Sequence, residues 1–217
     1  MAVRAETSIQ ILHQKTTCNF QRDIPAVRRA FRSRHAVILK KFISKDLCIQ
    51  IQREIAEGNF YRKRHKEIAI EICMRENRTT SLLNFLLNDP RLFRFIEAVT
   101  DCPRVLCFSG RLFSFVPGKG HYDSWHDDIN KVRLIGLSIN FSRRPYEGGV
   151  FQLRDKKTHR LYFQYANHGL GDAILFDIKP FLQHQVTEVT GDHPRTVYAG
   201  WFQRKPSYLA LLKRQMK

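Results

Sequence analysis

The chain has 217 residues, 43% of them apolar, which predicts one globular domain with a substantial core and excludes a disordered chain. Thirty-seven basic side chains against 20 acidic ones give a formal net charge of +17, which favours an anionic partner. The amino-terminal residues lack an apolar stretch fit for a signal peptide, and no apolar run approaches membrane-spanning length, so we expect no membrane association.

The first half of the chain reads as mostly helical. Apolar spacing predicts helices at residues 25–34, 44–57, 80–88 and 91–99, with an extended apolar segment at 36–42. Ser44 is the expected N-cap of the second helix, and Gly58 ends it. The pair Asp89-Pro90 separates the last two helices, because proline disfavours helical backbone in the residue before it.

After about residue 105 the pattern changes to short apolar runs between turns. We expect strands at residues 105–108, 111–116, 132–140, 149–153, 160–165, 173–176 and 197–202. Strands at this spacing indicate a sandwich or barrel rather than an alternating α/β sheet. The predicted fold is mainly β with N-terminal helices. Within one domain, residues 1–104 would form a mostly helical support, 105–203 the β core and 204–217 a basic tail.

The five cysteines are an odd number and lack the spacing of a metal-binding motif. We interpret them as small buried thiols, which suits a reducing, cytoplasmic compartment.

A His-x-Asp pair is the first part of a candidate metal site. Strand residues two apart project to the same face, so His126 and Asp128 can both point at one metal. The upstream pair His121 and Asp123 has the same spacing, which alone cannot choose between them. The later pair is favoured because glycines place His121 in a turn, whereas Trp125 begins the extended run. His121 would then lie at the pocket rim or on the surface.

His184 and Arg195 complete the set. A jelly-roll topology would return the chain across the barrel after residues 173–176 and bring His184 to the metal. Arg195 enters an apolar run, where a buried charge implies an anionic partner. Two imidazoles and one carboxylate suit mononuclear non-haem Fe(II), because they leave open positions for substrates. The guanidinium is suited to holding a carboxylate in two parallel hydrogen bonds, so the set indicates an oxygenase.

These motifs resemble those of the prolyl-4-hydroxylase-like branch of the Fe(II)/2-oxoglutarate-dependent dioxygenases. The likeness extends over about residues 36–202. The segments that carry it are AVILKKFISKDLC at 36–48, FVPGKGHYDSWHDD at 115–128, LSIN at 137–140, EGG at 147–149, GDAILF at 171–176, then His184, Val186, Gly191, Arg195 and GWF at 200–202.

The resemblance implies a double-stranded β-helix core of the jelly-roll or cupin-like type. It implies that His126, Asp128 and His184 bind Fe(II) and that Arg195 pairs with the distal carboxylate of 2-oxoglutarate. O2 would be the second cosubstrate and ascorbate a candidate reductant. The implied reaction hydroxylates a C–H bond and releases succinate and CO2. Asp128 as third ligand fits hydroxylation better than halogenation.

Two positions depart from the family pattern. Val116 stands where many relatives have a tyrosine before Pro-Gly, and Ser138 stands where another tyrosine is common. The hydrogen bonds to the cosubstrate must therefore differ in detail. Ser138 and Tyr198 are the candidates to supply them.

The expected substrate is an amino-acid side chain, free or in a peptide or carrier, or a similar small metabolite, and the charge favours an anionic one. A nucleic-acid demethylase is an alternative suggested by charge. Relatives of that kind carry a second arginine six residues after the first, and here Trp201 takes that place. A binding protein that merely retains the fold is the remaining alternative, against which the intact four-residue set argues.

Overall fold

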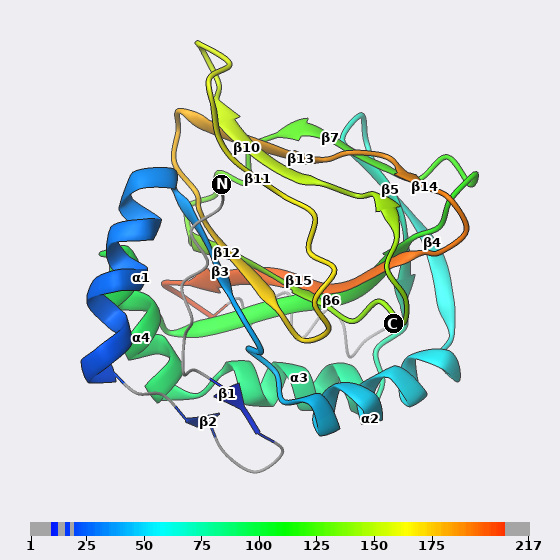
Figure 1. The fold of residues 1–217 in the computed structure, drawn as a ribbon, viewed down its shortest axis with the longest axis horizontal. Helices are drawn as coiled ribbons and strands as arrows, with labels where there is room; N and C mark the ends of the chain where they lie inside the picture. The colour runs from blue at the N-terminus through cyan, green and yellow to red at the C-terminus, as the bar shows by residue number, and fades with distance from the viewer. Residues whose placement is uncertain (1–9, 13–15, 18–19, 207–217) are drawn as a thin grey trace.

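The computed structural model describes residues 10–12, 16–17 and 20–206, and the helices among them lie in the first half of the chain (Figure 1). They are α1 (Phe20–Arg34), α2 (Lys45–Ala56), α3 (Arg78–Leu87) and α4 (Pro90–Thr100). All four predicted helices are confirmed. The structure begins α1 at Phe20 rather than at residue 25, and α3 at Arg78 rather than at residue 80.

Capping chemistry explains where the helices begin. The Asn77 side chain accepts a hydrogen bond from the backbone N–H of Thr80, whose hydroxyl accepts one from the Asn77 N–H, a capping box for α3. Asp89 caps α4, and Pro90 takes its first position, where no N–H is needed. Ser44 is the N-cap of α2, as predicted, although its side chain makes no capping hydrogen bond.

Eleven strands of the described chain form one antiparallel sheet that rolls into a nearly closed barrel. Their hydrogen-bonded order is β11-β10-β13-β7-β5-β6-β15-β8-β12-β3, with β4 bonded to β5 outside this path. The bounds are β3 (Ala36–Leu39), β4 (Phe60–His65), β5 (Ala69–Met74), β6 (Cys107–Phe115), β7 (Tyr122–His126), β8 (Arg133–Asn140), β10 (Phe151–Asp155), β11 (Leu161–Tyr165), β12 (Ala173–Asp177), β13 (Leu182–Val186) and β15 (Arg195–Gln203). Two short pairs lie outside the sheet: β1 (Gln10–Ile11) with β2 (Thr16–Thr17), and β9 (Glu147–Gly148) with β14 (Val189–Thr190). The predicted mainly-β fold with a double-stranded β-helix core is confirmed.

Two apolar cores lie on opposite faces of the strands from β6 to β3. On the outer face the helices pack against a cluster that includes Tyr198 and Phe202 (Figure 1). On the inner face, Phe113 and Phe176 meet Phe151 from the other half of the barrel. Because successive strand residues alternate between faces, the same strands build both cores.

The sequence does not predict the hairpin of β4 and β5, because residues 1–104 read as mostly helical support. Among the described residues, β4 pairs only with β5, and its Arg62 and Arg64 are exposed. An edge strand that carries charge on exposed positions shows little apolar alternation, so its sequence hides the strand. The first part of the chain therefore supplies part of the barrel as well as the helices. Residues 207–217 of the predicted basic tail lie outside the described part.

None of the helices in the described part of the chain has both the length and the apolar character that crossing a bilayer requires.

Candidate metal centre and cosubstrate pocket

His126 and His184 face each other across two neighbouring strands. His126 ends β7, His184 is the central residue of β13, and the two are paired in register. Their ring centroids are 4.3 Å apart. The rings of Phe151 and Phe176 lie 5.6 Å and 4.9 Å from the His184 ring. Strand register thus brings together two imidazoles that are remote in the chain and surrounds them with aromatic walls.

Asp128 joins the histidines from beyond the end of β7, not from within the strand as the spacing argument supposed. Its Oδ2 lies 3.6 Å from Nε2 of His184, and donor atoms of the three residues all lie within 4.8 Å of one another. Nη1 of Arg133 donates to Oδ1 at 2.8 Å, and Nε1 of Trp201 donates to Oδ2 at 2.7 Å. These two donors fix the orientation of the carboxylate.

The surroundings of His126 select which ring nitrogen can bind a ligand. Its Nδ1 lies 2.7 Å from the backbone oxygen of Ser124 and 3.3 Å from Oδ1 of Asp123. Both neighbours are acceptors, so Nδ1 is the nitrogen that donates to them and Nε2 is the nitrogen available to a metal. Burial lowers the pKa of His184 to about 4, so that ring is neutral at physiological pH. Two imidazoles and one carboxylate are a donor set that suits Fe(II).

The upstream pair, His121 and Asp123, forms no second three-residue donor group among the described residues. His121 is 7% exposed, and its Nδ1 accepts a hydrogen bond of 2.8 Å from the backbone N–H of Val116. The expectation that it lies at the rim or surface is wrong, because it is buried where it closes the turn before β7. Asp123 lines the cavity beside His126, and burial raises the pKa of its carboxyl to about 6.

Arg195 begins β15 and is 2% exposed. Its Nε and Nη1 atoms have no hydrogen-bond partner among the described residues. Burying unsatisfied donors of a charged group is costly, so this position is suited to an anionic oxygen group that would complete them. Gly149, at φ +59°, makes room for the arginine, because a Cβ there would lie 2.9 Å from Cδ of Arg195.

The two residues predicted to add cosubstrate hydrogen bonds lie on opposite faces of the sheet. Ser138 of β8 is 6% exposed and lines the cavity opposite Ala199. Tyr198 is buried on the outer face, where its ring centroid is 6.1 Å from that of Phe108. Tyr198 stands three positions after Arg195, and strand residues an odd number apart point to opposite faces. The prediction that Tyr198 contacts the cosubstrate is therefore not supported, because its side chain packs in the outer core and does not line the cavity.

One cavity of about 480 Å³ is lined by His126, Asp128, His184 and Arg195, a volume within the range of small-molecule sites. Its wall also holds charged and polar residues that the sequence reasoning did not single out: Lys63, His65, Glu71, Arg111 and Arg133. A signal for them exists in the sequence. Glu71 stands within the otherwise apolar residues 69–74, and a carboxylate inside a strand that is mostly buried requires partners.

A family model described as the 2OG-Fe(II) oxygenase superfamily matches residues 112–203, which include all four residues of the predicted set. A search of curated proteins finds no match to this chain.

Solved structures share the fold. A prolyl-4-hydroxylase from Pseudomonas putida is similar with a TM-score of 0.62 at 16% identity, covering 84% of this chain and 100% of that one. A 2OG-Fe(II) oxygenase family oxidoreductase from Burkholderia pseudomallei has a TM-score of 0.62 at 17% identity, with 87% and 94% covered. A prolyl hydroxylase from Trichoplax adhaerens, solved with a hypoxia inducible factor peptide fragment, has a TM-score of 0.60 at 12% identity, with 85% and 90% covered.

Proposed function

Because a family model described as the 2OG-Fe(II) oxygenase superfamily matches residues 112–203, we propose that the chain is a member of that superfamily and hydroxylates a C–H bond of an amino-acid, peptidyl or small-metabolite substrate. It is an Fe(II)- and 2-oxoglutarate-dependent enzyme that uses O2. Its products besides the oxidised substrate would be succinate and CO2, and ascorbate is a candidate reductant. The whole of residues 1–217 would act as a single oxygenase domain.

One observation carries this proposal: the His126, Asp128 and His184 donor group opens onto the same cavity as a buried arginine with unsatisfied donors. The three donors fit a metal ion that keeps open positions. The guanidinium fits the distal carboxylate of a keto-diacid held at that metal. Each half supports the other, because neither a bare donor cluster nor a buried arginine alone would imply 2-oxoglutarate.

Bound Fe(II) and 2-oxoglutarate supply the activation of O2 and the oxidation of the substrate C–H bond. In the proposed roles, His126, Asp128 and His184 hold the metal, and Arg195 holds the distal carboxylate of the cosubstrate. Ser138 is the proposed additional hydrogen-bond donor to that cosubstrate. The hydrogen bonds from Arg133 and Trp201 would keep Asp128 in its ligating position.

Aromatic residues have a separate proposed role in the same cavity. Phe113, Phe151 and Phe176 line it and belong to the inner apolar core. By limiting the access of water to the reacting centre, they would protect a strongly oxidising reaction from side reactions.

The proposed substrate carries an anionic group, since the protein has a formal net charge of +17 and basic side chains in the cavity wall. The Trichoplax adhaerens relative is solved with a peptide, which supports peptidyl substrates as one class to test. A cytoplasmic location is part of the proposal. The four cysteines in the described residues are free thiols, which suits a reducing compartment.

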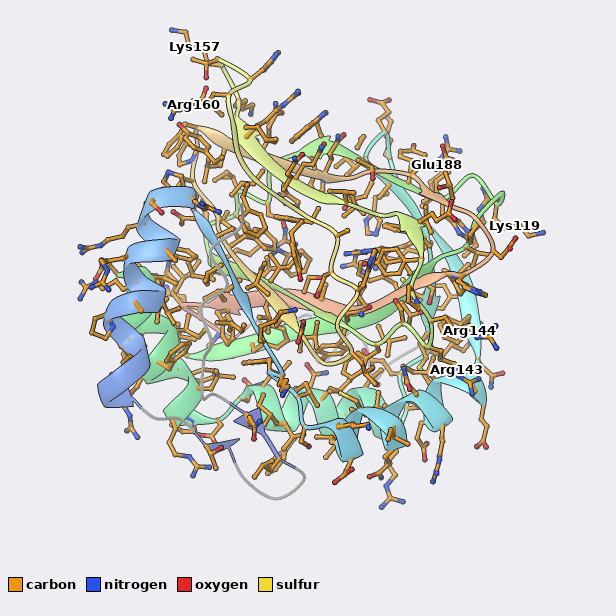
Figure 2. All side chains as sticks on the ribbon, in the orientation of Figure 1. Lys119, Arg143, Arg144, Lys157, Arg160 and Glu188 are labelled. Atoms are coloured by element: carbon orange, nitrogen blue, oxygen red, sulfur yellow. The ribbon has the colours of Figure 1, made fainter. Side chains whose placement is uncertain are left out.

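Oxidative demethylation of nucleic acid receives less support. The side chain of Trp201, at the position where such relatives carry a second arginine, donates instead to Asp128. Figure 2 shows Lys157 and Arg160 near one end of the molecule and Arg143 and Arg144 near another, so these cations do not form one continuous stripe. Binding of labelled DNA and RNA, measured at increasing salt concentration, separates a nucleic-acid enzyme from the proposed hydroxylase, because phosphate-driven binding weakens steeply with salt.

The test of the proposed function is turnover of 2-oxoglutarate by the purified protein with Fe(II) and O2. We expect oxygen uptake and stoichiometric succinate, slow without substrate and faster with an accepted one. The His126→Ala variant is the control for free iron. If the wild-type protein binds neither Fe(II) nor 2-oxoglutarate, the proposed function is wrong, and a binding protein that retains the fold becomes the better interpretation.

A further inference from the structure

A buried carboxylate organises the cavity wall formed by β5 and β6. Glu71 is 1% exposed, and its Oε1 accepts from Nε of Arg111 at 2.8 Å and lies 3.0 Å from Nε2 of His65. Burial acts to raise the pKa of Glu71, but the charge and hydrogen bonds of Arg111 outweigh it and lower that pKa. Glu71 is therefore a carboxylate at neutral pH, and it holds the guanidinium of Arg111 in one orientation on the cavity wall.

The hairpin adds further basic groups on the same wall. Lys63 of β4 is paired with Glu71, and His65 is paired with Ala69, so these side chains share one face of the hairpin. All four residues line the cavity. Arg64, between the two basic residues, lies on the opposite face of β4 and is exposed.

Arg111 also lies close to the candidate metal ligands. Its guanidinium carbon is 5.8 Å from the centre of the Trp201 ring, and that ring's Nε1 donates to Asp128 at 2.7 Å. The guanidinium of Arg133 lies 3.6 Å from the centre of the same ring. Each of the two guanidinium groups is paired with one carboxylate, Arg111 with Glu71 and Arg133 with Asp128, and both arginines line the cavity.

The geometry points to an anion subsite formed by Arg111 together with Lys63, which binds a carboxylate or phosphate group of the prime substrate. This inference rests on the proposed function, because it assigns part of the same cavity to the substrate of that reaction. A guanidinium carries about five N–H donors, more than its contacts with Glu71 and His65 use. Glu71 thus acts as a positioning residue, and Arg111 as the group that contacts the substrate.

This subsite is distinct from the one around Arg195. Arg111 is paired with Ala199, four residues along β15 from Arg195, which corresponds to roughly 13 Å along the strand. The two guanidinium groups also lie against different rings: that of Arg195 is 5.8 Å from the centre of the Phe115 ring, and that of Arg111 is 5.2 Å from the centre of the Phe113 ring. The cavity therefore offers one arginine to the cosubstrate and another to the substrate, with the metal donors exposed to both.

The test measures anion binding to the full-length protein loaded with Mn(II) and saturated with 2-oxoglutarate in the absence of O2. The probes are inorganic phosphate and N-acetylaspartate, titrated by calorimetry, and the paramagnetic relaxation of the phosphate 31P nucleus by Mn(II) reports its proximity to the metal. We expect both probes to bind wild type, with affinity at least about tenfold lower in Arg111→Gln and severalfold lower in Lys63→Gln. Arg64→Gln, the matched control on the exposed face, should leave both affinities unchanged.

Removing Arg111 alone leaves Glu71 buried without its main partner, which can destabilise the fold. The double variant Glu71→Gln/Arg111→Gln removes both charges and should lose probe binding while remaining folded. Equal affinity in wild type and in either Arg111 variant overturns the subsite, as does the absence of probe binding to wild type.

A single-stranded oligonucleotide provides the competing outcome. If it binds, and if Arg64→Gln weakens it as much as Arg111→Gln, the cations act as a general nucleic-acid surface and the subsite is contradicted. Failure of the proposed function appears separately, as a protein that binds neither Mn(II) nor 2-oxoglutarate. The phosphate titration is therefore repeated by calorimetry on the metal-free protein, so that loss of the anion subsite and loss of Mn(II) or 2-oxoglutarate binding remain distinguishable.

Discussion

The two faces of the strands β6, β15 and β8 carry different kinds of residue. Toward the helices, Tyr198 and Phe202 are fully buried in a continuous apolar core. Toward the cavity, the same strands present Arg195, Trp201 and Ser138 among aromatic side chains. Alternation along one strand thus separates the residues that stabilise the fold from those that line the candidate site. Changes on the two faces should therefore have separable consequences.

The largest expected effect is the loss of a candidate metal ligand. In Asp128→Ala or His126→Ala, 2-oxoglutarate turnover should fall at least about 100-fold, because losing even an outer partner of a metal ligand costs 10–100-fold. Succinate release measures the effect, and thermal unfolding should show the fold retained. If either variant keeps wild-type succinate production, the ligand assignment fails.

On the helix face, Phe202→Ala should lower the free energy of unfolding by about 3–5 kcal/mol, because it leaves a cavity beside Phe93 and Phe108. Urea denaturation measures this loss. Phe85, which is 77% exposed on α3, provides the matched control, and Phe85→Ala should change the stability by less than about 0.5 kcal/mol. Similar losses in both variants would contradict the burial on which the comparison depends.

On the cavity face, Arg195→Met should raise the KM for 2-oxoglutarate by about 30-fold or more, since truncating one partner of a buried charge pair costs about 2–5 kcal/mol. The apoprotein should lose little stability, because the guanidinium has two unsatisfied nitrogens without the cosubstrate. Kinetics and urea unfolding of the same variant test both halves. A large loss of apoprotein stability with an unchanged KM would reverse the assignment.

The smallest effects compare two hydroxyl groups on opposite faces. Ser138→Ala should weaken 2-oxoglutarate binding by about 1 kcal/mol, roughly fivefold, with little change in stability. Tyr198→Phe should leave the affinity for 2-oxoglutarate unchanged and alter stability by about 1 kcal/mol at most. A fivefold loss of affinity for 2-oxoglutarate in Tyr198→Phe would instead support the prediction from sequence that Tyr198 contacts the cosubstrate.

Much of the fold could be predicted because its signals are local. Apolar spacing located α2 and α4, and the Asp89-Pro90 pair marked the boundary before α4. The hairpin of β4 and β5 could not be predicted in this way. Its turn has Glu67 at φ +58° instead of a glycine, and its edge strand carries basic residues on exposed positions. Long-range pairing with β6 and β7 makes it a strand, and no local pattern reports that pairing.

The candidate site was predictable as an ordered motif, not as a geometry. Spacing placed Asp128 on the same strand face as His126, but the strand ends before it, and Arg133 with Trp201 orients its carboxylate instead. The alternation argument was sufficient to exclude Tyr198, which stands at an odd separation from Arg195. The contacts of Glu71 with Arg111 and His65 depend on tertiary pairing, so only the isolated acid is visible in the sequence.

The pairing of β13 makes correct strand alignment a condition for chemistry. His184 stands between Gln183 and Gln185, opposite His126 on one side and Leu153 on the other. A slip of one residue would turn the imidazole outward and present an amide to the metal, while leaving the strand content almost unchanged. A measurement of secondary-structure content would not distinguish such a molecule from the native one, although it would be inactive. The fraction of molecules that bind the metal would thus measure the fraction in which β13 has the correct register.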